Sequence, residues 1–154
     1  CGAAGGGGPL VPGCILGVAE VTTRFAPSGV NLGLVCSTPM VALSRNVSPK
    51  HAMEMLVLGD FISAQRAHEM GFINYLAAAD ELEQTVATLA QKIASKSALT
   101  LKIGKRAFYR QLDKGLIDAY DDCGQVMVEN MMARDAQEGI DAFMEKRTPH
   151  WRDE

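Results

Sequence analysis

The sequence predicts a mixed α/β protein that begins with short strands and turns and ends in a bundle of about four helices. Nine of the 15 glycines lie within residues 1–36, a distribution that favours turns and brief strands. From about Thr38 onward, apolar residues recur at helical spacing. The composition, 47% hydrophobic and 21% charged over 154 residues, is that of a globular protein. We therefore predict a core segment over residues 1–78 and a helical region over residues 79–154.

Strand or turn structure is expected over residues 24–26 and 30–32, where the apolar runs are short. Ser48 followed by Pro49 predicts an N-cap and the first turn of a helix, and Gly59 predicts its end.

Ser63 predicts the cap of a second, shorter helix that ends at Gly71. Residues 72–76 then predict a short strand.

Apolar stripes predict the remaining helices. The stripes are Leu82, Val86, Leu89 and Ile93, then Leu99, Ile103, Ala107 and Phe108, then Leu116, Tyr120, Cys123, Met127 and Met131. Asp135 with Glu138 resembles a capping box, and Ile140, Phe143 and Met144 give the last helix an apolar face.

Charge and cysteine usage exclude several classes of function. A net charge of -3 argues against nucleic-acid binding. No apolar run approaches the ~20 residues of a membrane span. The four cysteines and three histidines lack metal-ligand spacing, so we expect no metal site and interpret the thiols as isolated core residues.

Because the chain starts at Cys1 rather than Met, we interpret it as part of a longer protein.

The run Gly5-Gly6-Gly7-Gly8-Pro9 is the most informative local feature. Glycines allow close backbone approach, and free N–H groups at a helix start attract an anion or a developing oxyanion. A flexible tail or a tight turn is an equally good interpretation of the run taken alone.

Several segments occur in an order that resembles the enoyl-CoA hydratase/isomerase (crotonase) superfamily. They are residues 1–7 with Leu10 and Cys14, Phe25-Ala26, residues 28–39, residues 52–60, residues 62–73, and the ending Glu138-Gly139-Ile140-Asp141-Ala142-Phe143-Met144-Glu145-Lys146-Arg147. The resemblance spans nearly the whole chain, and residues 28–39 are most similar to one subgroup. It implies the C-terminal part of a crotonase-like spiral of ββα units, followed by a C-terminal helical region that assembles trimers and hexamers.

The resemblance also implies a ligand and a site. Acyl-CoA thioesters would be bound, and two backbone N–H groups would hold the thioester oxygen as an enolate forms. Gly6 matches one of these donors; the other belongs to a motif that no stretch of this chain resembles. Pro9 and Gly29 stand at the two positions where hydratases carry glutamates, so neither position offers an acid.

Ser37 falls where related isomerases and dehalogenases place an aspartate. We interpret Ser37 as a helix cap and Cys36 as a packed thiol, because neither replaces a carboxylate readily.

Phe143 and Lys146 match positions that contact the adenine and phosphate of coenzyme A bound to a neighbouring subunit. Core packing of Phe143 and a solvated helix end at Lys146 are the alternatives. Coenzyme A would enter as part of the substrate, with no other cofactor.

Residues 8–18 depart from the family, since Pro12-Gly13 would interrupt a helix and Ile15 replaces an aspartate.

The first hypothesis is an acyl-CoA-binding protein of the enoyl-CoA hydratase/isomerase type of fatty-acid metabolism, with its hydratase glutamates replaced. Whether it is an enzyme stays open; an active form would be a lyase or isomerase. The second is a non-catalytic acyl-CoA binder or assembly subunit, and the third a helical scaffold without a link to coenzyme A. We expect a homotrimer or hexamer in bacterial cytoplasm or the mitochondrial matrix, without membrane or nucleic-acid partners.

Overall fold

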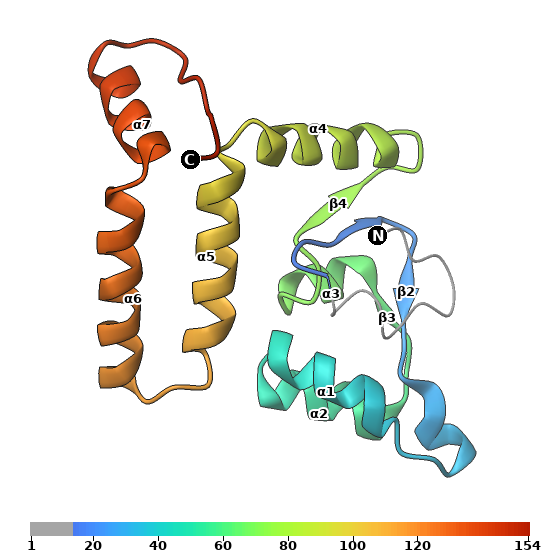
Figure 1. The fold of residues 1–154 in the computed structure, drawn as a ribbon. Coiled ribbons are helices and arrows are strands. Elements are labelled where there is room, and N and C mark those ends of the chain that lie inside the picture. The colour runs from blue at the N-terminus through green and yellow to red at the C-terminus, as the bar shows by residue number, and fades with distance from the viewer. Residues whose placement is uncertain (1–13) are drawn as a thin grey trace. The chain divides into compact units, whose positions relative to one another are not determined.

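The computed structural model describes residues 14–154, which form two compact units (Figure 1). The first unit extends to Thr88 and the second comprises Leu89–Glu154. The helix α4 (Leu82–Ala94) contributes its first half to one unit and its second half to the other. Gly6 and Pro9, which the resemblance places in the site, lie outside the described residues.

Two small sheets organise the first unit. Strand β1 (Val18–Glu20) pairs in parallel with β4 (Tyr75–Ala77), so that Val18 lies opposite Tyr75. Strand β2 (Arg24–Phe25) pairs in antiparallel with β3 (Ile62–Ser63). The Asn74 side chain links the residues that precede the two strands of the first sheet, because its Oδ1 accepts the Gly17 N–H at 2.8 Å.

Helices complete this unit: the 3₁₀ helix η1 (Ser28–Leu32), α1 (Ser37–Asn46), α2 (Pro49–Leu58) and α3 (Ala64–Glu69). The predicted caps are confirmed. Ser48 Oγ accepts the His51 N–H at 3.4 Å, and Ser63 Oγ accepts the Arg66 N–H at 3.1 Å. Gly59 ends α2 with a φ of 65°, a conformation that favours glycine.

The core of the first unit lies between these helices and the small sheets. The Phe25 and Phe72 rings meet edge to face, with centroids 5.3 Å apart. The buried members are Ala19, Phe25, Leu43, Val47, Ala52, Met55, Ala64, Ala67, Met70, Phe72 and Ile73.

The second unit contains α5 (Ala98–Gln111), α6 (Leu116–Met131) and α7 (Arg134–Met144). Helices α5 and α6 run side by side and are joined by a short turn (Figure 1). The predicted helices are confirmed, but the apolar stripe of α6 is not buried. Tyr120 is 74% exposed and Met127 is 63% exposed.

The capping box predicted from Asp135 and Glu138 is wrong. Ala133 is the N-cap residue of α7 and makes no side-chain cap hydrogen bond. Both carboxylates instead accept hydrogen bonds from the C-terminal segment (residues 145–154), which folds back over this helix. The prediction failed because the competing donors lie far along the chain.

Among residues 14–154, no helix combines the length and the apolar character that crossing a membrane requires.

Candidate functional site

Gly29 lies in η1, which packs against the end of α2. The Asn31 Nδ2 donates to the Gly59 carbonyl at 3.2 Å. A Cβ atom built on Gly59 would lie 2.5 Å from Val30 Cγ1, so the close approach of η1 to α2 depends on a glycine there. The contacts of Val30 and Asn31 with Gly59 therefore position Gly29, the residue just before them.

A side chain does not fit at Gly29 in this arrangement. A Cβ atom would lie 2.6 Å from Cys36 Sγ and 3.1 Å from the Leu34 carbonyl oxygen. The Leu34 N–H also donates to the Gly29 carbonyl at 3.0 Å, which closes the loop between them. Cys36 thus occupies the volume that any side chain at Gly29 would need.

Cys36 and Ser37 stand at the start of α1, near the position where related proteins carry an aspartate. Cys36, not Ser37, is the N-cap residue of α1, and neither side chain makes a cap hydrogen bond. The helix-cap interpretation of Ser37 is therefore wrong, because the helix starts one residue earlier than a serine cap would require. The Cys36 thiol is partly buried against Gly29, in agreement with a packed thiol.

The segment from Val21 to Met53 contains no Asp or Glu. The flanking carboxylates are already engaged. Glu20 accepts the Thr22 hydroxyl at 2.5 Å, and Glu54 pairs with Arg66 at 3.5 Å.

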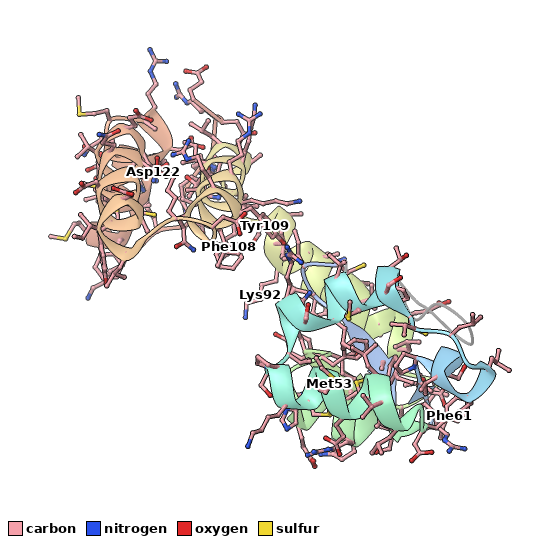
Figure 2. All side chains as sticks on the ribbon, turned by 90° about the horizontal axis from the view of Figure 1, so that it is seen from below. Met53, Phe61, Lys92, Phe108, Tyr109 and Asp122 are labelled. Atoms are coloured by element: carbon pink, nitrogen blue, oxygen red, sulfur yellow. The ribbon has the colours of Figure 1, made fainter. Side chains whose placement is uncertain are left out.

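An exposed apolar surface surrounds η1, and the sequence patterns did not indicate it. The Arg24 guanidinium lies 4.7 Å from the centroid of the Phe61 ring, which is labelled at the edge of the first unit in Figure 2. The exposed apolar members near η1 are Val30, Leu32, Leu34 and Val35. Such a surface can cover an apolar ligand or another polypeptide.

Phe143 and Lys146 lie at the end of α7. Phe143 is 81% exposed, so the core-packing interpretation is wrong for this chain. Lys146 is also exposed, and its ammonium forms no ion pair among residues 14–154. An exposed aromatic ring and a free cation within one turn can stack on a base and attract a phosphate.

Glu138 and Arg147 form a bidentate ion pair next to this turn. Arg147 Nη1 lies 2.6 Å from Glu138 Oε1 and Nη2 lies 3.0 Å from Oε2. Glu138 also accepts the His150 N–H at 2.7 Å. The Arg147 hydrogen bonds, followed by that of His150, lower the pKa of Glu138 to about 2, and Glu138 in turn raises the pKa of Arg147. Glu138 is therefore a charged acceptor at neutral pH and not a proton shuttle.

Asp135 is buried, with 2% of its surface exposed. Its two oxygens accept the backbone N–H groups of Arg152 at 2.8 Å and Asp153 at 3.0 Å. These bonds, led by that from Arg152 and aided by the Ser97 hydroxyl, lower the pKa of Asp135. Sequence patterns indicated this carboxylate only as part of a capping box and missed its actual role, because its partners lie 17 and 18 residues away.

A cavity of about 470 Å³ lies between α7 and the C-terminal segment. Its walls include Glu138, Asp141, Arg147, His150 and Arg152, so acidic and basic groups are mixed. Across the described part of the chain, no three His, Cys, Asp or Glu residues gather in a way that could hold a metal ion.

Known proteins resemble this chain over nearly all of its length. The human mitochondrial enoyl-CoA hydratase domain-containing protein 3 is 46% identical over 149 residues, which cover 97% of this chain and 49% of that protein. It represents the subgroup that residues 28–39 resemble. A solved enoyl-CoA hydratase from Mycobacterium smegmatis is 46% identical with a TM-score of 0.91, over 97% of this chain and 58% of that one.

A relative named for another reaction is also similar. The 1,4-dihydroxy-2-naphthoyl-CoA synthase of Mycobacterium tuberculosis is 35% identical over 151 residues, 97% of this chain and 48% of that protein. The chain thus spans about half the length of the curated relatives it matches. The family model for enoyl-CoA hydratase/isomerase matches residues 2–154. The chain belongs to the enoyl-CoA hydratase/isomerase family.

Proposed function

We propose that this chain supplies acyl-CoA-binding surfaces to a protein that does not hydrate enoyl-CoA by the two-glutamate route. The observation that carries the proposal is the packing at Gly29. By the resemblance, Gly29 stands where hydratases of the family carry one of their two glutamates. Cys36 Sγ fills the space where a side chain would begin, 2.6 Å from the Cβ position. Water addition needs an acid and a base in reach of the substrate, and this segment provides neither.

Thioester binding and enolate stabilisation remain as the chemistry of the proposal. The Gly6 N–H would be one oxyanion donor, and Phe143 with Lys146 would contact the nucleotide end of coenzyme A. Coenzyme A enters only as part of the substrate, with no further cofactor. A lyase or isomerase reaction of fatty-acid metabolism is compatible with this proposal, because such a reaction can proceed through a stabilised enolate without the two hydratase glutamates. The names of the relatives include both a hydratase and a synthase, which supports acyl-CoA binding more than any single reaction.

Isothermal titration calorimetry with crotonyl-CoA, together with a hydration assay of the same sample, tests this proposal. We expect heat of binding and no loss of the enoyl absorbance. Hydration by the purified chain would contradict the loss of two-glutamate chemistry. Absence of any binding would contradict the acyl-CoA site.

A non-catalytic assembly subunit is the second candidate, and the exposed face of α6 favours it. Apolar side chains that a lone chain leaves in water are typical of interfaces. On this helix they are Leu116, Ile117, Tyr120, Met127, Val128 and Met131, each at least half exposed. A homotrimer or hexamer built through the helical region would cover them. Acyl-CoA binding without any turnover in the assembled protein would favour this candidate over the first.

Location and other partners follow from charge and from the relatives. The name of the human relative includes the word mitochondrial, which supports the mitochondrial matrix, with bacterial cytoplasm as the alternative. The net charge of -3 does not favour a nucleic-acid partner, and we propose no membrane partner.

A further inference from the structure

The turn that follows α7 holds a lysine in a conformation that glycine usually adopts. Lys146 has a φ of 55°. The Lys146 N–H donates to the Phe143 carbonyl at 3.3 Å and the Arg147 N–H donates to the Ala142 carbonyl at 3.0 Å. This pair of hydrogen bonds is the Schellman motif, in which the left-handed residue is most often Gly because a Cβ atom is disfavoured there.

The residue after the strained lysine is anchored on both sides. The guanidinium of Arg147 forms two hydrogen bonds with Glu138, at 2.6 and 3.0 Å, and its Nε forms a third with Glu145 at 2.6 Å. Only 25% of the Glu138 side-chain surface is exposed. The His150 N–H adds a bond of 2.7 Å to the same carboxylate. These contacts stabilise the turn after α7, although the Cβ atom of Lys146 disfavours the left-handed conformation that the turn requires.

The turn so fixed carries two side chains that face solvent. Phe143 is 81% exposed, and the Lys146 ammonium has no ion-pair partner among the described residues. Strained residues persist where the surrounding structure holds them, and they concentrate at ligand sites. A fixed turn would reduce the entropy that a ligand must remove on binding.

We propose that Glu138 and Arg147 are positioning residues that fix the left-handed turn at Lys146 and thereby present Phe143 and Lys146 to the nucleotide part of an acyl-CoA. This inference rests on the proposed acyl-CoA-binding function. Neither residue touches the ligand; each acts through the backbone of the turn. Loss of the ion pair leaves Phe143 and Lys146 in place in the sequence but lets the turn open.

Calorimetric titration of the full chain with two thioesters tests the inference. The ligands are octanoyl-CoA and octanoyl-pantetheine, which carries the same acyl group and lacks the nucleotide. The variants are Glu138→Ala and the milder Glu138→Gln, which keeps a hydrogen-bonding group. The matched control is Asp122→Asn, which removes the carboxylate that Arg110 and Lys114 contact at 2.8 and 3.1 Å.

We expect Glu138→Ala to weaken octanoyl-CoA binding by about tenfold and to leave octanoyl-pantetheine binding unchanged. Glu138→Gln should show a smaller loss in the same direction, and it decides the matter should Glu138→Ala fail to fold. Asp122→Asn should change neither affinity, even where its loss of thermal stability equals that of the Glu138 variants.

Unchanged octanoyl-CoA affinity in a folded Glu138 variant would overturn the inference. Equal losses for both thioesters would also overturn it, since they would indicate a general structural effect. No binding of either thioester by the unaltered chain would overturn the proposed function itself, and this inference with it.

Discussion

The Asp135 carboxylate accepts the backbone N–H of Arg152 at 2.8 Å, so the first turn of α7 holds the C-terminal segment. Asp153 adds its own N–H at 3.0 Å, and its Oδ1 accepts the Ala98 N–H at 2.7 Å at the start of α5. The buried Asp135 carboxylate and the Asp153 carboxylate together therefore connect the end of the chain with α7 and α5.

Replacement of Asp135 by Asn should destabilise the second unit. An amide presents donors where the carboxylate accepts two backbone N–H groups, and it loses the charge that strengthens both bonds. We expect the Tm to fall by several degrees in a circular-dichroism melt. Asp113→Asn, at an exposed position after α5, is the control and should leave the Tm unchanged. Equal melting of both variants would contradict the structural role of Asp135.

Acid should weaken the fold through Glu138. Its pKa is lowered from 4.5 to about 2, so the folded state prefers the charged form. The resulting stability is complete above pH 4.5 and is lost as the pH falls toward 2. The free energy of unfolding, measured with urea across this pH range, should decline steeply as the pH falls. Glu138→Gln should make this decline with pH less steep. An identical decline in the variant would indicate that other carboxylates, such as Asp135 and Asp122, dominate.

A side chain at Gly29 should be costly because of Cys36. We expect Gly29→Ala to lower the free energy of unfolding by about 1–3 kcal/mol through overpacking. Adding Cys36→Ala removes Sγ, so the double variant should recover part of this loss, and the two changes should not be additive. Gly124→Ala, on α6 where a Cβ meets nothing within 4 Å, should instead stabilise by about 0.5–1 kcal/mol. Additive effects at 29 and 36 would contradict the contact.

Replacement of Lys146 by Gly should separate stability from binding. Glycine adopts the φ of 55° without a Cβ penalty, so the free energy of unfolding should rise by about 1 kcal/mol. The proposed binding role predicts weaker acyl-CoA affinity in the same variant, because the cation is gone. Chemical denaturation and calorimetry measure the two effects on one sample. A variant that is more stable and binds acyl-CoA with unchanged affinity would contradict the binding role of Lys146.

A charge on the exposed face of α6 should reduce self-association. Ile117 is 77% exposed and lies in the first turn of that helix. We expect sedimentation to give three or six times the mass of the chain, and Ile117→Asp to shift it toward a single chain, since an interface would bury the new charge. Glu129→Gln, which changes charge without adding any to the apolar face, is the control. A single-chain mass for the unaltered protein would contradict the assembly.

Local signals predicted much of the fold. Ser48, Ser63 and Gly59 act within one helical turn of their own position, so their roles follow from the sequence. Helices α4 to α7 follow from apolar spacing in the same way. The strand predicted over 72–76 forms instead at Tyr75–Ala77, because the Phe72 and Ile73 N–H groups both donate to the Ala67 carbonyl.

Non-local contacts account for what the sequence did not predict. Asp135 and Glu138 spaced by three residues fit a capping box, yet their partners come from the C-terminal segment. The distance of 2.6 Å between the Cβ position of Gly29 and Cys36 Sγ also depends on how the loop after η1 folds back. The contacts of the Cβ position with Cys36 Sγ and the Leu34 carbonyl explain why glycine suits position 29.

The chain contains a single tryptophan, and its location makes it a built-in optical probe. Trp151 Nε1 donates to the Ser95 carbonyl at 2.8 Å, and the indole ring lies 3.4 Å from the Cβ position of Gly139. Fluorescence excited selectively in the indole therefore reports on the C-terminal segment alone. Its emission spectrum should shift to longer wavelengths once that segment detaches, with no dye or added label.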